Sequence, residues 1–365
     1  MTGIVGPRGV GKTSLLLQLL KEKLHDQENV LYVQLDDVHF STQSLFEFAR
    51  EFVLKGGKML ALDNLHKYPE GVTDLQKIAE ELPDLKILFA GSSAGDDDGA
   101  FYELSRIASL HYLPGLSFRE FLEFRYDHAF PVIQMDELLE YNRMPGVEVL
   151  HRIRPLQYFD EYLTQGFYPQ QIENPALYYQ SVMNLVNKVL TEDFSVVHRI
   201  DYESVLKIRR LLAKLAVEGP FKPNIEKLAD EVGTTRDSLL KFLKYLHRAG
   251  MIGWLTKGHE DVNYFNKPDR LLMSNSCLIA ALSPDLPSRE SLLETFLHNQ
   301  LRLAHQVNLT SRGSYLMDLE YEFEMEWMTG GSNKGKSKSQ AYVVSPEAES
   351  ASGNVIPLWM FGFLY

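Results

Sequence analysis

The stretch "TGIVGPRGVGKTSLLLQLL", residues 2–20, decides the fold. A short apolar strand leads directly into "GPRGVGKT", and a helix follows at once, which is the context that the G-x-x-x-x-G-K-[ST] phosphate loop requires. The glycines let successive backbone N–H groups turn inward toward phosphate oxygens, and the helix N-terminus adds its positive end. The residues predicted to bind the phosphates are Gly6, Pro7, Arg8, Gly9, Val10, Gly11, Lys12, Thr13 and Ser14.

Four further apolar runs follow the loop. They are "NVLYVQLDD" (29–37), "KMLALD" (58–63), "KILFAGSS" (86–93) and "SLHYLPG" (109–115), and helical stretches at 44–56 and 72–82 lie between them. Buried strands that alternate with helices are typical of a parallel sheet covered on both faces. The sequence therefore predicts the α/β class, with a P-loop NTPase core.

Polar residues end two of these runs. Asp63 ends the 58–63 run, where a P-loop ATPase holds Mg²⁺ beside the loop hydroxyl, here that of Thr13. Lys12 is placed to reach the β- and γ-phosphates. Ser92 and Ser93 end the 86–93 run, where such proteins keep a polar sensor of the γ-phosphate or of the attacking water; a simple turn is the alternative. The expected ligands are ATP and Mg²⁺, with Thr13 and Asp63 as the metal ligands and Asp63 also part of the nucleotide site.

Bulk properties exclude several classes of protein. The 365 residues are enough for about two or three domains, and a net charge of -12 argues against a surface that coats nucleic acid, so any DNA contact must be local. The single cysteine, Cys277, excludes an internal disulfide and a Cys-rich zinc site and fits a reducing compartment. No membrane-spanning run or signal-peptide pattern is present, so we expect a cytoplasmic protein with no membrane partner.

Several segments together resemble one family. They include "GPRGVGKTSLLLQLL" (6–20), "LALDNLHKYP" (60–69), "LPGLSFREFLEF" (113–124), "PFKPNIEKLADEVG" (220–233), "ETFLHNQL" (294–301) and "IPLWMFGFLY" (356–365). Over nearly the whole chain they resemble a prokaryotic AAA-type P-loop ATPase family. Its members join the ATPase core to a winged helix and a C-terminal region similar to restriction-endonuclease-like folds, a domain of unknown function. Members usually carry a further segment before the loop, whereas this sequence starts at the first strand.

The chain departs from this family beside Asp63. Family members generally read Asp-Glu there, and this sequence has Asn64 in place of the Glu. The Glu orients and polarises the attacking water, and an amide cannot accept the proton, so Asn64 in this catalytic position predicts binding without fast turnover. We expect a loss of about 100-fold or more in hydrolysis, because general acid–base catalysis contributes about 10²–10⁴. Asp36, Asp37 or His66 could replace the missing acid.

A second departure follows "LS" at 104–105. Relatives often carry paired arginines there, whereas here Arg106 is followed by Ile107. Arg106 is a candidate catalytic finger acting on a neighbouring subunit's nucleotide, and a surface salt bridge is the alternative.

The resemblance and the pattern divide the chain into four parts. We predict an ATPase core at 1–125, a helical lid at 126–200, a winged helix-turn-helix at 201–275 and a small α+β C-terminal domain at 276–365. In the third part, "NIEKLADEVG" and "TTRDSLLKFLKYLHRAG" form two helices across a glycine turn. The second helix is predicted to present Arg236, Lys241 and Lys244 to DNA, and the alternative is a module that only packs or contacts protein.

The fourth part contains "DLEYEFEMEW" (318–327), which alternates acidic and apolar residues. As one strand it would place the five acids on one face and bury the other. A restriction-type nuclease needs Glu-x-Lys on such a strand, and Glu324 is followed by Met325 and Glu326, so the site is degenerate and a structural or partner-binding role is expected. The terminal "NVIPLWMFGFLY" (354–365) is predicted to be a buried strand that ties the C-terminus into this domain.

The sequence thus predicts a nucleotide switch that binds ATP and ADP and hydrolyses ATP poorly. Its winged helix is expected to contact DNA or a protein partner, and a homo-oligomer is one of the expected assemblies. Three alternatives stay open. They are an active ATPase motor or loader that uses another acid, an ATP-regulated nuclease-like enzyme acting through Glu324 and Glu326, and a non-enzymatic scaffold.

Overall fold

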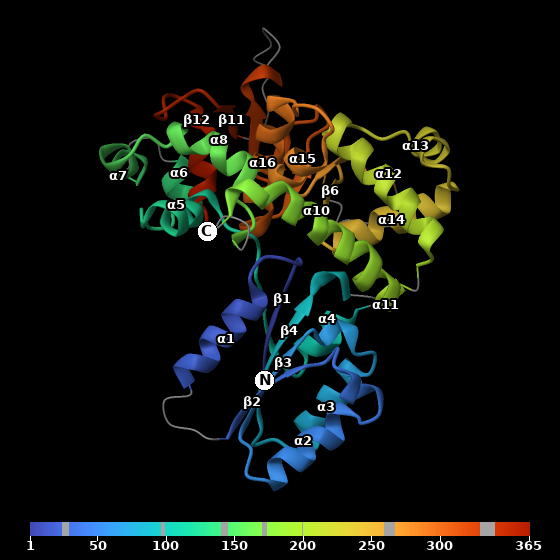
Figure 1. The fold of residues 1–365 in the computed structure, drawn as a ribbon. Helices are drawn as coiled ribbons and strands as arrows, with labels where there is room; N and C mark the ends of the chain where they lie inside the picture. Colours follow the sequence, from blue (N-terminus) through green and yellow to red (C-terminus); the bar gives the residue numbers. More distant parts are fainter. Residues whose placement is uncertain are drawn as a thin grey trace. The chain divides into compact units, whose positions relative to one another are not determined.

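The computed structural model describes residues 1–23, 29–95, 99–139, 145–169, 174–198, 200–258, 267–328 and 340–365 (Figure 1). The chain divides into two compact units. Unit 1 comprises residues 1–115, 184–206 and 248–250, and unit 2 comprises residues 116–183, 207–247 and 251–365. Within the described ranges, no helix has the length and apolar character needed to cross a membrane.

A five-stranded parallel sheet forms the centre of unit 1 (Figure 1). The strands are β1 (Thr2–Gly6), β2 (Val30–Gln34), β3 (Met59–Asp63), β4 (Lys86–Ser92) and β5 (Ser109–Tyr112). Their order, β2-β3-β4-β1-β5, puts β4 between the strand before the phosphate loop and the strand that ends in Asp63. This confirms the predicted α/β class, and each predicted run forms a strand of the sheet.

Helices cover both faces of this sheet, because successive strand residues point to opposite sides. On one face, Leu16 and Leu20 of α1 (Lys12–Lys23) pack against Met59, Ala61 and Ala90. The other face is covered by α2 (Leu45–Leu54), α3 (Gly71–Glu81) and α4 (Ala100–Ser105). Short 3-10 turns, η2 (Val38–Ser41), η3 (Leu65–Lys67) and η4 (Ser93–Gly95), follow β2, β3 and β4.

A later segment of the chain returns to unit 1. It begins in α10 (Tyr178–Lys188), continues through one π-helical stretch, η6 (Val189–Asp193), and ends with α11 (Phe194–His198). Val189, Leu190 and Phe194 are buried. This segment belongs to the region predicted as a helical lid, and its contribution to the core unit is a finding of the structure.

Unit 2 is helical in its first part. Its helices there are α5 (Phe118–Tyr126), α6 (Met135–Leu139), α7 (Pro145–Arg152), α8 (Leu156–Gln165) and η5 (Pro175–Leu177). α5 begins at a capping box in which Ser117 and Glu120 bond reciprocally, which satisfies N–H groups that the first turn leaves unpaired. The buried ring of Phe159 has its centroid 5.2 Å from that of Phe118 and 4.8 Å from that of Phe296, so these aromatic residues form part of the core.

A helix pair and a two-stranded sheet follow α12 (Tyr202–Glu218). α13 (Ile225–Val232) ends at Gly233, whose φ of 78° is a left-handed C-cap that glycine adopts without strain. α14 (Arg236–Arg248) comes next, and then β6 (Ile252–Leu255) pairs antiparallel with β7 (Arg270–Met273). The two predicted helices and their glycine turn are confirmed.

The last part of unit 2 contains a mixed five-stranded sheet of order β12-β11-β10-β9-β8. Its elements are α15 (Ser276–Leu282), α16 (Arg289–Ala304), β8 (Val307–Leu309), β9 (Tyr315–Met317), β10 (Tyr321–Met325), η7 (Glu326–Met328), β11 (Gln340–Ser345), β12 (Val355–Pro357) and η8 (Leu358–Phe363).

The predicted ten-residue acidic strand is wrong in length. β10 pairs with β9 across a three-residue connection in which Asp318 and Leu319 have φ values of 49° and 61°, and extended backbone does not have these values. The strand therefore begins after them and stops at Met325. Glu322 is buried beside buried Phe323, so the five acids do not share one solvent face.

The terminal apolar run also differs from its prediction. Only Val355–Pro357 is a strand, and residues 358–363 form a buried 3-10 helix. A run buried on every side has no periodicity that separates strand from helix, which explains the error. The backbone carbonyl of Tyr365 accepts hydrogen bonds from Ser117 Oγ and Arg119 Nε, each 3.0 Å long, so the end of the chain is held by residues at the start of α5, outside the predicted 276–365 domain.

Leu16 and Leu17 test the packing of α1. Leu16 is fully buried and Leu17 is 45% exposed. Leu16→Ala should lower the free energy of unfolding by about 2–5 kcal/mol, because it leaves a cavity under the sheet. Leu17→Ala should change it by about 0.5 kcal/mol or less. Urea unfolding followed by circular dichroism measures both, and equal losses would contradict the packing described here.

Candidate nucleotide-binding site

The site lies at one edge of the unit 1 sheet. Because β1, β2, β3 and β4 are parallel, their carboxyl ends meet at the same edge, which is where open α/β sheets bind ligands. Gly6 is in register with Ser92, and Gln34 is in register with Asp63. The sheet order thus brings the loop and the ends of β2, β3 and β4 together.

The phosphate loop has the backbone that its glycines allow. Gly9 and Gly11 have φ values of 88° and 100°, a region that other residues rarely adopt. A Cβ on Gly6 would lie 2.2 Å from the carbonyl oxygen of Leu113, so no side chain fits there. α1 begins at Lys12, and its helix N-terminus faces the end of the loop, as predicted.

The side chain of Lys12 folds over this loop. Its Nζ donates to the carbonyl oxygens of Gly6 at 2.9 Å and Pro7 at 2.6 Å. Burial lowers the pKa of Lys12 to about 8, against the opposing negative charges of Asp193 and Asp63. The ammonium is therefore held beside the loop carbonyls and close to two carboxylates.

Asp63 joins the loop to the sheet. Its Oδ2 accepts hydrogen bonds from Thr13 Oγ1 at 2.7 Å and Tyr32 OH at 2.9 Å, and its Oδ1 accepts from the backbone N–H of Asn64 at 2.9 Å. Mg²⁺ takes oxygen ligands such as carboxylates, and Thr13 Oγ1 together with the buried Asp63 carboxylate provides such oxygens. The predicted metal ligands fit a nucleotide-bound Mg²⁺.

Tyr32 is a site residue that sequence analysis did not identify. Burial and the hydrogen bond to Asp63 raise the pKa of Tyr32 to about 12, so the phenol stays protonated and keeps donating to the carboxylate. The available signal was its position in β2, two residues before Gln34, which is the register partner of Asp63.

Asn64 has a left-handed backbone, with φ 59° and ψ 35°, which asparagine tolerates better than most residues. Its Nδ2 donates to Asp36 Oδ1 at 3.0 Å, and Lys67 Nζ donates to Asp36 Oδ2 at 2.9 Å. Burial alone would raise the pKa of Asp36, and the hydrogen bonds from Lys67 and Asn64 reverse this and lower it. Asn64 therefore acts as a donor to a neighbouring acid.

The other candidate replacements for a catalytic acid are also engaged. Asp37 Oδ1 accepts the backbone N–H of His39 at 2.9 Å and caps η2. His66 Nδ1 accepts the backbone N–H of Ser92 at 3.1 Å, so its proton is on Nε2, which lies 3.4 Å from Asp193 Oδ1. In this tautomer, His66 is a donor to Asp193 and has no second acceptor nitrogen.

Asp193 is the second site residue that sequence analysis did not identify. It ends η6, is fully buried, and its Oδ1 accepts from Arg8 Nη1 at 2.7 Å. Arg8 Nη2 donates to Glu192 Oε2 at 2.9 Å, and Lys67 lies 3.5 Å from the same oxygen. No local motif around "TEDF" (191–194) signals this role, because a tertiary contact creates it.

The serines and Arg106 occupy different environments. Ser92 is buried, and its Oγ accepts the backbone N–H of Ala94 at 3.3 Å, as a turn residue does. Ser93 Oγ is buried and has no hydrogen-bond partner among the described residues. Arg106 is exposed at the end of α4 with Nη1 3.4 Å from Glu103 Oε2, the geometry of the surface ion pair considered above.

The predicted DNA-binding residues lie on α14, and nearby acids neutralise part of their positive charge. Arg236 is near two acids, 3.7 Å from Glu226 and 3.5 Å from Asp237. Lys241 is exposed, and no acid lies within ion-pair distance of it in the described parts of the chain, whereas Lys244 is half-buried.

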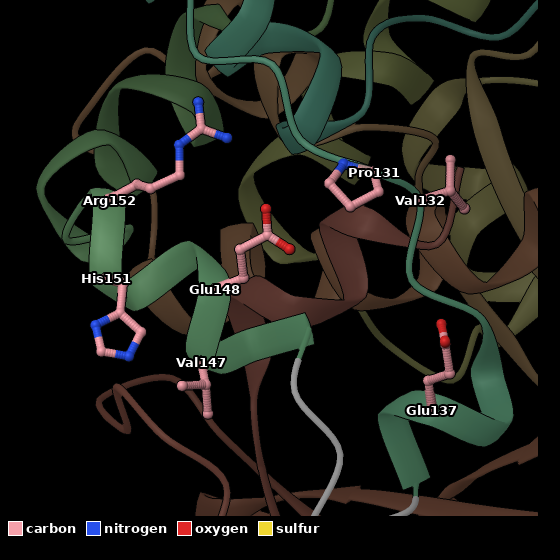
Figure 2. Close-up of a pocket in the computed structure, with 7 residues that line it drawn as sticks. All are labelled: Pro131, Val132, Glu137, Val147, Glu148, His151 and Arg152. Carbon is pink, nitrogen blue, oxygen red and sulfur yellow. The ribbon is translucent and has the colours of Figure 1, made fainter.

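A hollow of about 520 Å³ in unit 2 contains none of the predicted site residues (Figure 2). α7 contributes four of its lining residues, and the others come from α6 and the segment before it; the lining residues are Pro131, Val132, Glu137, Val147, Glu148, His151 and Arg152. Arg152 donates to the carbonyl oxygen of Ala129 at 2.8 Å and stacks on Phe130 at 4.3 Å, so structural contacts already hold its guanidinium.

Comparison with known proteins agrees with the geometry of unit 1. Residues 1–122 match a family model described as an AAA domain, and residues 156–289 match one described as a domain of unknown function (DUF8612). The match and the five-stranded sheet with its phosphate loop identify an AAA-type P-loop ATPase domain in the first third of the chain. The search of curated proteins found no match.

Two solved structures share 14% and 17% sequence identity with the chain. The first is titled a DNA replication initiation factor, with a TM-score of 0.28 and coverage of 68% of this chain and 85% of that chain. The second is AMPPCP-bound DnaA from Aquifex aeolicus, with a TM-score of 0.26 and coverage of 67% of this chain and 81% of that chain.

Thr13 provides a direct test of the proposed metal ligands. Thr13→Val keeps the shape of the side chain and removes the hydroxyl, so Mg²⁺ should no longer strengthen ATP binding, with a loss of about tenfold or about 1.4 kcal/mol. Thr13→Ser should keep the effect. Titration of a fluorescent ATP analogue with and without EDTA measures it, and full Mg²⁺ dependence in the valine variant would contradict the assignment.

Proposed function

We propose that this chain, whose first third is an AAA-type P-loop domain, is a nucleotide switch that binds Mg-ATP and hydrolyses it slowly. One observation carries the proposal. The loop, Lys12, Thr13 and Asp63 lie together at one edge of the sheet, which supports binding of a magnesium–triphosphate there, while the residue after Asp63 is an amide that donates to Asp36.

The chemistry of hydrolysis explains why turnover is slow. The attacking water must lose a proton, and a carboxylate in the position after Asp63 would accept it. The Asn64 amide nitrogen is a donor, and its neutral oxygen is a much weaker base than a carboxylate. Binding depends on other residues and is retained. ATP and ADP are the proposed ligands, and the bound nucleotide defines the state of the switch.

Asn64→Glu tests this proposal. In single-turnover reactions with Mg-ATP, the variant should hydrolyse ATP about 100-fold faster or more than the wild type, with nucleotide affinity unchanged. Asn64→Gln is the matched control, because it lengthens the side chain in the same left-handed backbone without adding a carboxylate, and its rate should stay low. A wild-type rate equal to that of the glutamate variant would contradict the proposal.

A second proposed function is DNA contact by unit 2. The order α13, glycine turn, α14 and the antiparallel pair β6–β7 supports a winged helix, with α14 as the helix that meets DNA. Exposed Lys241 carries the proposal best, because Arg236 is flanked by Glu226 and Asp237. Lys244 lies one helical turn further along the same helix. A protein-contact module remains the alternative.

Lys241→Ala tests DNA contact. It should weaken binding of duplex DNA about equally for all sequences and reduce the slope of log affinity against log salt by about 1. Lys227→Ala is the control, since Lys227 is an exposed lysine on α13 that pairs with Glu231. Fluorescence anisotropy at several salt concentrations measures both variants, and equal behaviour of the two would point to the protein-contact alternative.

We further propose self-association of this chain and a cytoplasmic location. Self-association would let exposed Arg106 of one copy reach the nucleotide of another, and the cytoplasm is the proposed compartment.

The nuclease alternative has little support. Glu326 accepts a hydrogen bond from Ser345, and the described ranges contain no group of three or more His, Cys, Asp or Glu placed to hold a metal ion. A structural or partner-binding role for the C-terminal sheet fits these contacts better.

A further inference from the structure

We propose that Asp193 accepts the proton of the attacking water in the slow turnover of ATP, the role that Asn64 cannot perform. This inference rests on the proposed binding of Mg-ATP and names the group through which hydrolysis proceeds. It assigns a catalytic role to a residue more than a hundred positions away from the loop in sequence and in contact with it in the fold.

The Asp193 carboxylate is buried, and its two oxygens have different environments. Asp193 has no solvent exposure, and Arg8 Nη1 and His66 Nε2 both approach its Oδ1, at 2.7 and 3.4 Å. Its Oδ2 is buried and has no hydrogen-bond partner among the described residues. An unsatisfied buried polar group costs about 1–3 kcal/mol, so such an atom in a native fold calls for a functional explanation. An incoming water molecule would satisfy it.

Asp193 lies beside the phosphate loop. Arg8, which holds Asp193, is the third residue of the phosphate loop. Burial lowers the pKa of Lys12, and the negative charges of Asp193 and Asp63 both oppose this lowering, so both carboxylates lie near its ammonium group. Lys12 is the residue that reaches the β- and γ-phosphates in such loops. The Asp193 carboxylate is therefore placed beside the phosphate-binding groups.

The other groups that could accept the proton are already engaged in hydrogen bonds. Asp36 is held by Asn64 and Lys67, and Asp37 caps η2. His66 uses Nδ1 as an acceptor for the N–H of Ser92 and turns Nε2 toward Asp193. The histidine thus orients the Asp193 carboxylate and fixes which of its oxygens stays unpaired. His66 is a positioning residue here.

This hydrolysis needs no reactant other than ATP and water. The water oxygen forms a bond to the γ-phosphorus as the bond from that phosphorus to the β–γ bridging oxygen breaks, and the bond's electron pair leaves with ADP. The water proton passes to Asp193 Oδ2 and gives a neutral carboxyl group. That proton then passes to the phosphate or to solvent, so ATP and water become ADP and inorganic phosphate.

Asp193→Asn is the principal test. The substitution keeps the shape of the side chain and an oxygen that accepts from Arg8, but it removes the carboxylate that would accept the proton. The single-turnover rate of ATP hydrolysis should therefore fall about tenfold or more. The affinity for a non-hydrolysable ATP analogue with Mg²⁺ and the thermal midpoint should stay close to wild type. Glu192→Gln is the matched control, because Glu192 is the adjacent acid on the same arginine, and its rate should fall much less than that of Asp193→Asn.

A double-mutant cycle separates catalysis from positioning of Arg8. In the Asn64→Glu background, the glutamate accepts the proton, so Asp193→Asn should lower the rate by about twofold or less. An equal fold-loss in both backgrounds would show that Asp193 acts only through Arg8 and would overturn the proposal, as would an unchanged rate in the wild-type background. A wild-type protein that does not bind the analogue would overturn the proposed function together with this inference.

Asp193→Glu keeps the test decisive if the asparagine variant fails to fold. It retains the negative charge opposite Arg8 and moves the carboxylate by one methylene. The thermal midpoint and analogue affinity should be retained while the single-turnover rate falls about threefold or more, because proton transfer depends on position. A glutamate variant with full wild-type turnover would contradict the proposed role.

Discussion

The hydrogen bond from Thr13 to Asp63 is the contact on which the candidate site depends. It joins the first turn of α1 to the end of β3, although β4 lies between β3 and the strand that precedes the loop. Only a parallel sheet in this order brings the loop and the β3 carboxylate to one edge. The packing of helices on both faces of the sheet holds that order, so the chemistry of the edge depends on the core beneath it.

Charge balance explains how the edge is built. Arg8 pairs with Glu192 and Asp193, and Lys67 pairs with Asp36 and Glu192. Lys12 and Asp63 are held by hydrogen bonds to uncharged groups. A glutamate at position 64 would add a further negative charge beside Asp36. Asn64 instead donates to that acid and adopts the left-handed backbone more easily. The amide therefore favours the local structure, and it leaves position 64 without a group that can accept a proton.

The sequence predicts the parts of this site that local motifs encode. The loop, the strand ending in Asp63, and the glycine turn between α13 and α14 each depend on neighbouring residues, and each was predicted. Tyr32 and Asp193 were missed because their roles come from contacts made across the fold. The C-terminal acidic strand was predicted too long, since the positive φ values of Asp318 and Leu319 are set by a tight connection that the alternating pattern hides.

A protein of this kind should keep its bound nucleotide in the form of ATP. The most direct measurement is to load the protein with labelled ATP and Mg²⁺, remove free nucleotide rapidly, and follow the ratio of ATP to ADP on the protein over time. The account predicts retained nucleotide that stays mainly ATP for many minutes. Rapid conversion to bound ADP, or no retained nucleotide, would contradict it.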